Sequence, residues 1–158
     1  KFLGMTIVNG KIAISKKALE AARLKVKELT PRGTNRPIEA TIFDFNKWFR
    51  GWAAYFDMTY YPAQIKTIEA RFRRRLRARI VSQQKRRRHL FNKLKKNKVK
   101  PKAAARAAFS NNGRWHLSRE KVVEQAFPNK WFIQRGMLIR SRDQLPHWLS
   151  DNYWVHLT

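Results

Sequence analysis

An apolar stripe surrounded by arginine runs from residue 65 to residue 88 and constrains the fold more than any other stretch. Its apolar residues recur at intervals of three and four, which places them on one face of an α-helix. The stripe consists of Ile65, Ile68, Phe72, Leu76 and Ile80. The other faces carry six arginines, and residues 85–88 add four more basic side chains. Glu69 is the one acid in this stretch, so the arginines predict an external polyanion rather than internal salt bridges.

The charge of the whole chain supports this interpretation. The sequence has 36 Lys and Arg against 10 Asp and Glu, a net charge of +26, which is typical of nucleic-acid-binding proteins. Residues 66–106 hold 18 of the basic residues and one acid, so the charge is local rather than diffuse. An apolar fraction of 43% with 13% aromatics is enough for a packed core, which excludes a disordered basic tail.

Other kinds of site have little support in the sequence. There is no cysteine, no pair of histidines at helical spacing and no glycine-rich phosphate loop, and no apolar run is long enough for a membrane span. Glu120 and Glu124 lie one helical turn apart, but basic neighbours indicate a solvated helix face. Ser118 and Lys121 match S-x-x-K without its companion motifs, so we interpret Ser118 as an N-cap. We expect no catalytic residue, no metal site and no membrane contact.

The N-terminal part predicts a β-hairpin followed by three helices. Asn9-Gly10 between two β-prone runs predicts a type I′ turn, so residues 2–14 should form a hairpin that packs either on the following helices or on an upstream sheet. Ser15 is a good N-cap for a helix over residues 16–29. Pro37 begins a second amphipathic helix that reaches Phe56, and the arginine-rich helix follows. Short connections predict an antiparallel three-helix bundle.

Beyond residue 88 the pattern predicts only short helices, so the fold class is mainly α. These helices are expected within residues 89–102, from Pro101 to about Phe109, after Ser118, over 129–135 and over 141–150. Gly51 lies inside the second helix, where it predicts a close helix crossing. Trp48 and Tyr55 lie off the main apolar stripe of that helix and are therefore candidates for stacking on nucleobases.

The sequence favours RNA over DNA as the polyanion. Arginine outnumbers lysine in the main basic helix, which favours bidentate contacts to phosphate. The sequence has no recognisable unit for reading the major groove of DNA, and an evenly basic helix reads backbone shape rather than base sequence. With six to ten phosphate contacts, affinity should fall by roughly 10³ to 10⁵ between 50 and 200 mM salt.

Five short motifs, in order over residues 1–149, resemble the reverse transcriptases encoded by group II introns, which also act as maturases. Residues 1–4, Lys-Phe-Leu-Gly, are similar to the last block of the palm, and residues 50–56 to the RGW-x-x-YF signature of the thumb. Residues 73–77 resemble the RRRLR core of the next thumb helix. Gly113-Arg114-Trp115, and then Ala126, Asn129 and Gly136, are similar to the motifs that close the maturase domain. Arg114 and Lys47 depart from the family's usual aromatic and proline at those positions.

The resemblance implies four parts: a terminal palm hairpin (1–14), a helical thumb (15–88), the remainder of the maturase, or X, domain (89–149) and a tail (150–158). It also implies group II intron RNA and a template–primer duplex as partners, together with the upstream fingers and palm of the same protein. The polymerase aspartates are expected upstream of Lys1, so no cofactor is expected in this piece, whereas the parent polymerase and the intron ribozyme would use Mg²⁺. The implied localisation is the bacterial cytoplasm or an organelle.

Two alternatives stay open at this stage. A reverse transcriptase that serves CRISPR adaptation or phage defence has a similar thumb. A basic scaffold protein that binds RNA without an enzymatic parent would have a similar composition.

The basic side chains predicted to contact RNA fall into a main and a secondary surface. The main surface is expected to contain Arg71, Arg74, Arg77, Lys85, Arg86, Arg87 and Arg88, and the secondary surface Lys16, Lys17, Arg32 and Arg36. The arginines opposite the apolar stripe, Arg71, Arg74 and Arg77, should face RNA. Arg75 and Arg79 lie at the edge of the stripe, where their aliphatic stems are expected to pack against the bundle.

Overall fold

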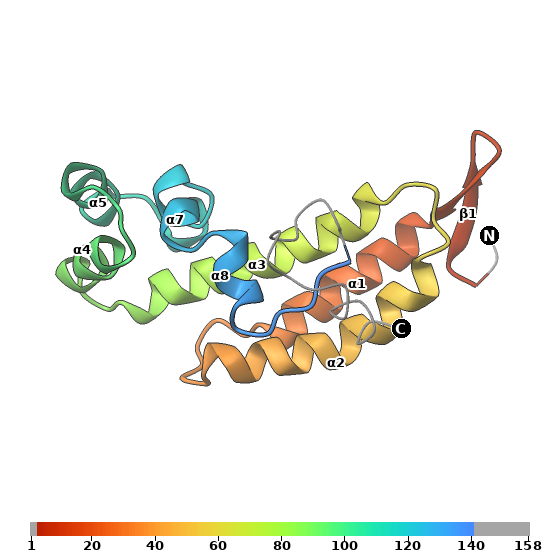
Figure 1. Cartoon of the computed structure of the whole chain (residues 1–158), viewed down its shortest axis with the longest axis horizontal. Helices are drawn as coiled ribbons and strands as arrows, with labels where there is room; N and C mark the ends of the chain where they lie inside the picture. The colour runs from red at the N-terminus through yellow and green to blue at the C-terminus, as the bar shows by residue number, and fades with distance from the viewer. Residues whose placement is uncertain (1–2, 141–158) are drawn as a thin grey trace.

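A computed structural model describes residues 3–140 and shows a mainly helical chain with one two-stranded sheet in that range (Figure 1). The elements in chain order are β1 (Met5–Val8), β2 (Lys11–Ile14), α1 (Lys16–Leu29), α2 (Ile38–Phe56), α3 (Ala63–Gln83), α4 (Arg87–Lys96), α5 (Pro101–Ala108), α6 (Arg114–Leu117), α7 (Lys121–Ala126) and α8 (Asn129–Ile133). The predicted fold class is therefore confirmed.

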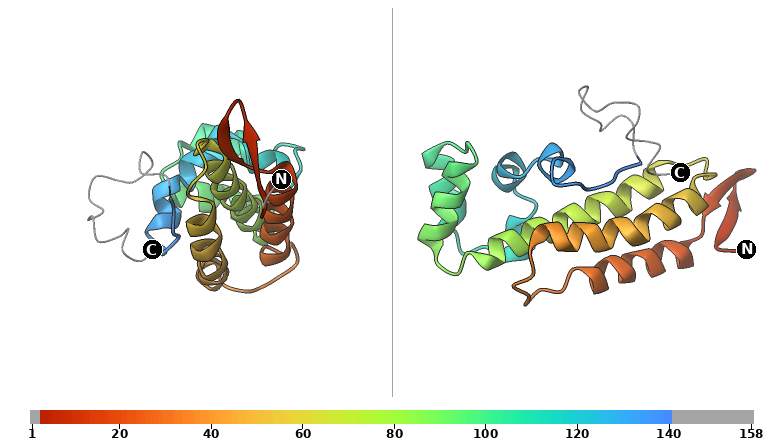
Figure 2. Two further views of the ribbon diagram at one scale, coloured as in Figure 1. Left: turned by 90° about the vertical axis from the view of Figure 1, so that its right-hand side faces the viewer. Right: turned by 60° about the horizontal axis from the view of Figure 1, so that its bottom comes forward.

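Helices α1, α2 and α3 run side by side as the expected antiparallel bundle (Figures 1 and 2). Their apolar stripes meet in a core of aromatic and aliphatic side chains. The rings of Phe45 and Phe72 stack with centroids 3.8 Å apart, and Phe49 continues the stack at 4.9 Å from Phe45. All three phenylalanines are fully buried. The apolar stripe of the arginine-rich helix thus packs on the aromatic stripe of α2.

The hairpin lies on the connection between α2 and α3. Asn9 and Gly10 both have positive φ, 50° and 73°, and Val8 pairs with Lys11, as a type I′ turn requires. The Gln64 side chain pairs with the backbone of Ile14: its Oε1 accepts from the Ile14 amide at 2.9 Å, and its Nε2 donates to the Ile14 carbonyl at 3.0 Å. The sequence left open whether the hairpin packs on the following helices or on an upstream sheet. The structure shows contact with the following helices.

Local signals at helix ends are confirmed in some places and wrong in others. Ser15 caps α1, because its Oγ accepts a hydrogen bond from the Ala18 amide at 3.2 Å. Ser118 does not begin a helix: it follows the one-turn helix α6, and its Oγ donates to the Trp115 carbonyl at 2.6 Å. The next helix starts only after Glu120. The close crossing predicted at Gly51 is also wrong, because this residue is exposed and a Cβ there would meet nothing within 4 Å.

The predicted basic stretch 65–88 is divided between two helices. Helix α3 ends at Gln83, and α4 starts at Arg87 after a short turn. Helix α3 reaches beyond the ends of α1 and α2, and there α4 and α5 pack against each other and against α7 (Figures 1 and 2). Leu94 of α4, Ala104 of α5 and Val123 of α7 are fully buried between these three helices.

The last described residues return along the bundle and are held by polar side chains of α2 and α3. Asn46 bonds twice, from its Nδ2 to the Gly136 carbonyl at 2.6 Å and from the Leu138 amide to its Oδ1 at 2.9 Å. The Arg140 amide donates to buried Glu69 at 2.6 Å. The helix predicted over 141–150 and the tail lie outside the described residues.

Gln64→Leu should destabilise the protein because it removes both hydrogen bonds to the Ile14 backbone. We expect a loss of about 1–3 kcal/mol in the free energy of unfolding, measured by urea denaturation. Gln83→Leu is the matched control, since Gln83 is exposed at the end of the same helix, and it should leave the midpoint nearly unchanged. Equal midpoints for the two variants would contradict the anchoring role of Gln64.

Candidate nucleic-acid interface

Most arginines of α3 are bound within the fold rather than displayed on its surface. Arg73, Arg77 and Arg79 are only 3%, 6% and 3% exposed. Where these side chains have partners, the acceptors are mainly backbone carbonyls and side-chain hydroxyl or amide oxygens. Arg73 Nη1 instead lies 3.9 Å from Oε2 of buried Glu69. The inference from the scarcity of acids to an external polyanion was therefore wrong for these side chains, because the protein itself supplies their partners, which for Arg77 and Arg79 are neutral oxygens.

Arg77 is the clearest correction to the predicted RNA surface. Its Nε donates to the Phe127 carbonyl at 2.9 Å, and its Nη2 donates to Asn129 Oδ1 at 3.2 Å. Burial, with repulsion from Arg73 as a second cause, lowers the pKa of Arg77 from 12.5 to about 10, so the side chain still carries its charge at neutral pH. Arg77 faces the segment between α7 and α8 rather than solvent.

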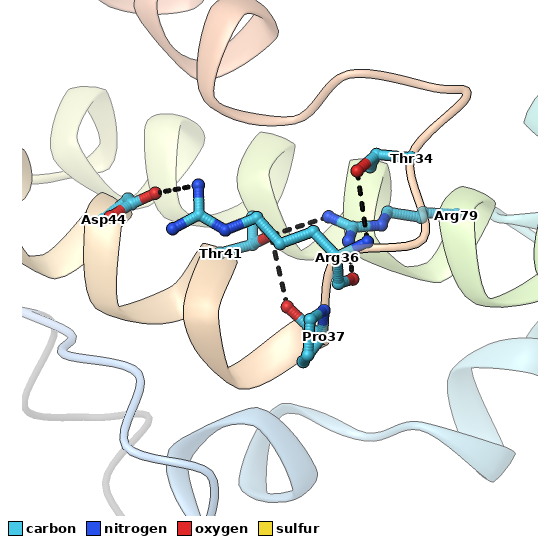
Figure 3. A network of polar contacts seen from close by, with 6 residues as sticks. All are labelled: Thr34, Arg36, Pro37, Thr41, Asp44 and Arg79. Atoms are coloured by element: carbon cyan, nitrogen blue, oxygen red, sulfur yellow. Dashed lines mark hydrogen bonds and ion pairs between the residues drawn. The ribbon is translucent and has the colours of Figure 1, made fainter.

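Arg75 and Arg79 do more than pack their stems against the bundle. The Arg75 side chain donates to both the hydroxyl and the carbonyl of Thr30, the latter at 2.9 Å. Arg79 donates to Thr41 Oγ1 at 2.6 Å and to the Arg36 carbonyl (Figure 3). Burial lowers the pKa of both arginines. Together they fix the two ends of the loop between α1 and α2 against α3.

Arg36, predicted to contact RNA, is partly engaged by the same network. Its Nη1 lies 2.6 Å from Asp44 Oδ2, although half of the Arg36 side chain is exposed (Figure 3). Arg71 and Arg74 are half-buried. The guanidinium of Arg74 lies 3.7 Å from the centre of the Trp115 ring and donates to the Trp115 carbonyl at 3.4 Å. These three arginines are thus partly accessible.

A dense group of exposed cations lies in α4, α5 and the turns that flank them, residues 85–108, which we call the basic lobe. Residues 70–119 contain no acid, and in the described part of the chain no cation of the lobe makes an ion pair. The exposed basic side chains of the lobe are Lys85, Arg86, Arg87, Arg88, Lys95, Lys96, Lys98, Lys100, Lys102 and Arg106. The positive potential of this lobe is therefore uncompensated.

Sequence reasoning found only part of this surface. It selected residues 85–88, all of which are exposed here, but it did not select the lysines from 95 to 102 or Arg106. The net charge of residues 66–106 was the signal that contained them. Lys16 and Lys17 are also exposed, but they lie at the hairpin end of the bundle, opposite the basic lobe (Figure 1). The structure thus separates these two lysines from the main surface, whereas Arg32 and Arg36 of the secondary surface lie on the loop that α3 holds.

The two stacking candidates on α2 have structural partners. Trp48 is half-buried, with its ring 5.6 Å from Trp52 and 5.9 Å from Phe45. Tyr55 is 44% exposed, and its hydroxyl donates to the Leu3 carbonyl at 2.9 Å. Trp48 thus contributes to the core, and Tyr55 ties the start of the described chain to α2.

Residues 3–140 lack the features of two other classes of site. No helix there is long and apolar enough to cross a membrane. The same range holds no group of three or more His, Cys, Asp or Glu side chains placed to share a metal ion. These features define a small, mainly helical protein with one strongly basic lobe.

Comparison with known families identifies this class more closely. A family model described as the maturase-specific domain of group II introns matches residues 19–99, more than half of the chain. The chain therefore belongs to the group II intron maturase family. A search of curated proteins found no match. Family membership supports a maturase-type role in group II intron splicing, with group II intron RNA as the partner, over the two alternatives left open by the sequence.

Replacing Arg77 tests whether its role is internal. Arg77→Met should lower the free energy of unfolding by about 1–3 kcal/mol, because the buried Phe127 carbonyl loses its donor. Arg86→Met, at an exposed position, should change it by less than about 0.5 kcal/mol. Urea denaturation of both variants gives the measurement. If Arg77→Met were as stable as the wild-type protein, its assignment as a structural residue would be wrong.

Proposed function

We propose that the chain binds group II intron RNA through the basic lobe and thereby stabilises the folded intron during splicing. The observation that carries this proposal is the contrast between the two sets of cations. The arginines of α3 are largely used inside the fold, whereas the ten lobe cations listed above are exposed and make no ion pair with a described residue. Such a surface attracts phosphates and gains affinity from the counterions it releases.

The chemistry of the lobe fits the shape of structured RNA rather than its base sequence. Six of the ten exposed cations listed above are lysines, namely Lys85 and the five between residues 95 and 102. Lysine acts as a mobile point charge towards phosphate, without the fixed fork of arginine. The packed helices beneath, with Leu94 and Ala104 fully buried, hold these charges on a firm support. The lobe would thus neutralise phosphates where RNA helices approach each other, a task that Mg²⁺ otherwise performs.

We also propose that the hairpin end of the bundle serves the polymerase implied by the family resemblance. Ile7 and Ile12 pair across the hairpin and expose 74% and 46% of their surfaces on the same face, an apolar face that suits contact with a palm domain upstream in the same protein. Lys16 and Lys17 lie beside it on α1. They are the candidates for contact with a template–primer duplex held between palm and thumb.

Neutralising three lobe lysines should weaken binding of a group II intron RNA. The variant combines Lys96→Gln, Lys98→Gln and Lys102→Gln, all at exposed positions. Because each lysine at a phosphate contributes about one to the slope of log K against log salt, the slope should become shallower by up to about 3. Filter binding between 50 and 200 mM salt measures it, and a thermal melt should be nearly unchanged.

A charge-matched control separates the lobe from total charge. Lys27→Gln, Lys47→Gln and Lys130→Gln together remove the same charge from exposed positions on α1, α2 and α8. This control should retain most of the wild-type slope. If both triple variants lost affinity equally, binding would depend on net charge alone, and the lobe would not be the interface.

The maturase role itself is tested by splicing. With the chain in its parent protein, the lobe variant should require more Mg²⁺ than the wild type to splice its intron, since protein cations and Mg²⁺ neutralise the same phosphates. The control variant should follow the wild-type Mg²⁺ dependence. Identical Mg²⁺ requirements for all three proteins would contradict the proposed mechanism.

A further inference from the structure

A cavity of about 300 Å³ lies where the loop between α1 and α2 meets the C-terminal part of α3 and the start of α6. Four arginines line it, and no acid does. The lining residues that matter here are Thr30, Arg32, Arg75, Arg79, Arg114 and Trp115. An open cavity with four guanidinium groups and no carboxylate is an unbalanced concentration of positive charge.

The four arginines differ in how far the protein itself satisfies them. Arg75 and Arg79 form hydrogen bonds to the loop, as described above, and Arg114 donates to Ser82 Oγ at 2.8 Å. Arg32 is exposed and has no hydrogen bond or ion pair to any described residue. The pKa of Arg75 is lowered first by burial and then by the charge of Arg32. These cations repel each other, so an anion between them would be stabilised.

Trp115 adds an aromatic surface to the same cavity. The residue is 37% exposed and lines this cavity and a neighbouring one. Arg74, whose guanidinium lies over the indole ring, lines only the neighbouring cavity. The indole ring is therefore held by a cation–π contact with Arg74, and Trp115 contributes to the wall of the arginine-lined cavity.

We propose that this cavity binds one unpaired nucleotide of RNA, with its phosphate at Arg32 and Arg114 and its base stacked on Trp115. The proposal rests on the proposed RNA-binding function and names a second, different contact. The volume lies at the lower end of the range for ligand sites, which suits a single nucleotide. Stacking on an aromatic ring beside a positively charged groove is how proteins hold single strands without reading sequence.

The position of the cavity relates it to the basic lobe. Arg79, in the cavity wall, is four residues before Gln83, the last residue of α3, which corresponds to about 6 Å along the helix axis. The turn that begins the basic lobe follows directly. A strand that leaves an RNA helix on the lobe can therefore reach the cavity, so the two surfaces would together recognise a junction between paired and unpaired RNA.

The test compares two probes on the full chain. One is hexauridylate, and the other is a ribose–phosphate chain of the same length without bases. The wild-type protein should bind hexauridylate more tightly. Trp115→Leu should weaken hexauridylate binding by about 5- to 100-fold and leave the abasic chain unaffected, whereas Arg32→Gln should weaken binding of both. Lys130→Gln, at an exposed position on α8, is the control for loss of one charge.

Each outcome decides the proposal. If Arg32→Gln bound both probes as Lys130→Gln does, the phosphate site would be refuted. If the wild-type protein bound the two probes equally, or if Trp115→Leu weakened both alike, stacking would be refuted even if that variant were less stable. Arg32 makes no contact that the fold needs, so its variant remains interpretable. The proposed function is tested separately, by binding of the lobe variant to intron RNA. If the lobe variant bound intron RNA as the wild type does, the proposed function would be contradicted, but the results for the cavity on short probes would still hold.

Discussion

The hydrogen bond from a buried guanidinium to an uncharged oxygen is the interaction on which this structure depends. Arg75 and Arg79 of α3 hold the loop between α1 and α2, and Arg77 holds the segment between α7 and α8. Burying a charge is costly, and burial lowers the pKa of all three. The guanidinium tolerates this cost because it stays protonated and offers five donors in a fixed fork. Helix α3 thereby anchors two segments that are far apart in the sequence, one near residue 30 and the other near residue 129.

This use of arginine separates two kinds of cation that look alike in the sequence. Arg73, Arg77 and Arg79 of α3 are surrounded by protein and contribute to the fold, whereas the lysines after residue 94 lie on the surface of the basic lobe. The distinction follows from chemistry. An ammonium is strongly hydrated and has no planar fork, so it gains little from a buried carbonyl and remains in water, where a phosphate can reach it. The +26 net charge therefore overstates the surface available to RNA.

The sequence predicted the parts of the fold that local signals determine. Asn9-Gly10 specified the hairpin turn, Ser15 capped α1, and apolar spacing located α1, α2 and α3. It could not predict which arginines would be covered. The helical wheel of α3 shows where Arg77 points, but the oxygens that meet it come from Phe127 and Asn129, fifty residues later. The prediction that Ser118 begins a helix was also wrong. This residue follows Leu117, the last residue of α6, and is the C-cap of that helix.

These long-range contacts also show how much of the chain the fold needs beyond the residues that match the family. The family match covers residues 19–99, from within the first turn of α1 to just beyond α4, but the partners of the α3 arginines extend further. Trp115 covers Arg74, Phe127 accepts from Arg77, and the segment from 136 to 140 bonds to Asn46 and Glu69. The arginine-lined cavity likewise takes Arg114 and Trp115 from α6. A chain that ended at residue 99 would leave buried guanidinium groups without acceptors and the cavity without one wall. The region that folds therefore extends through α8, and the cavity proposed to bind a nucleotide extends to α6.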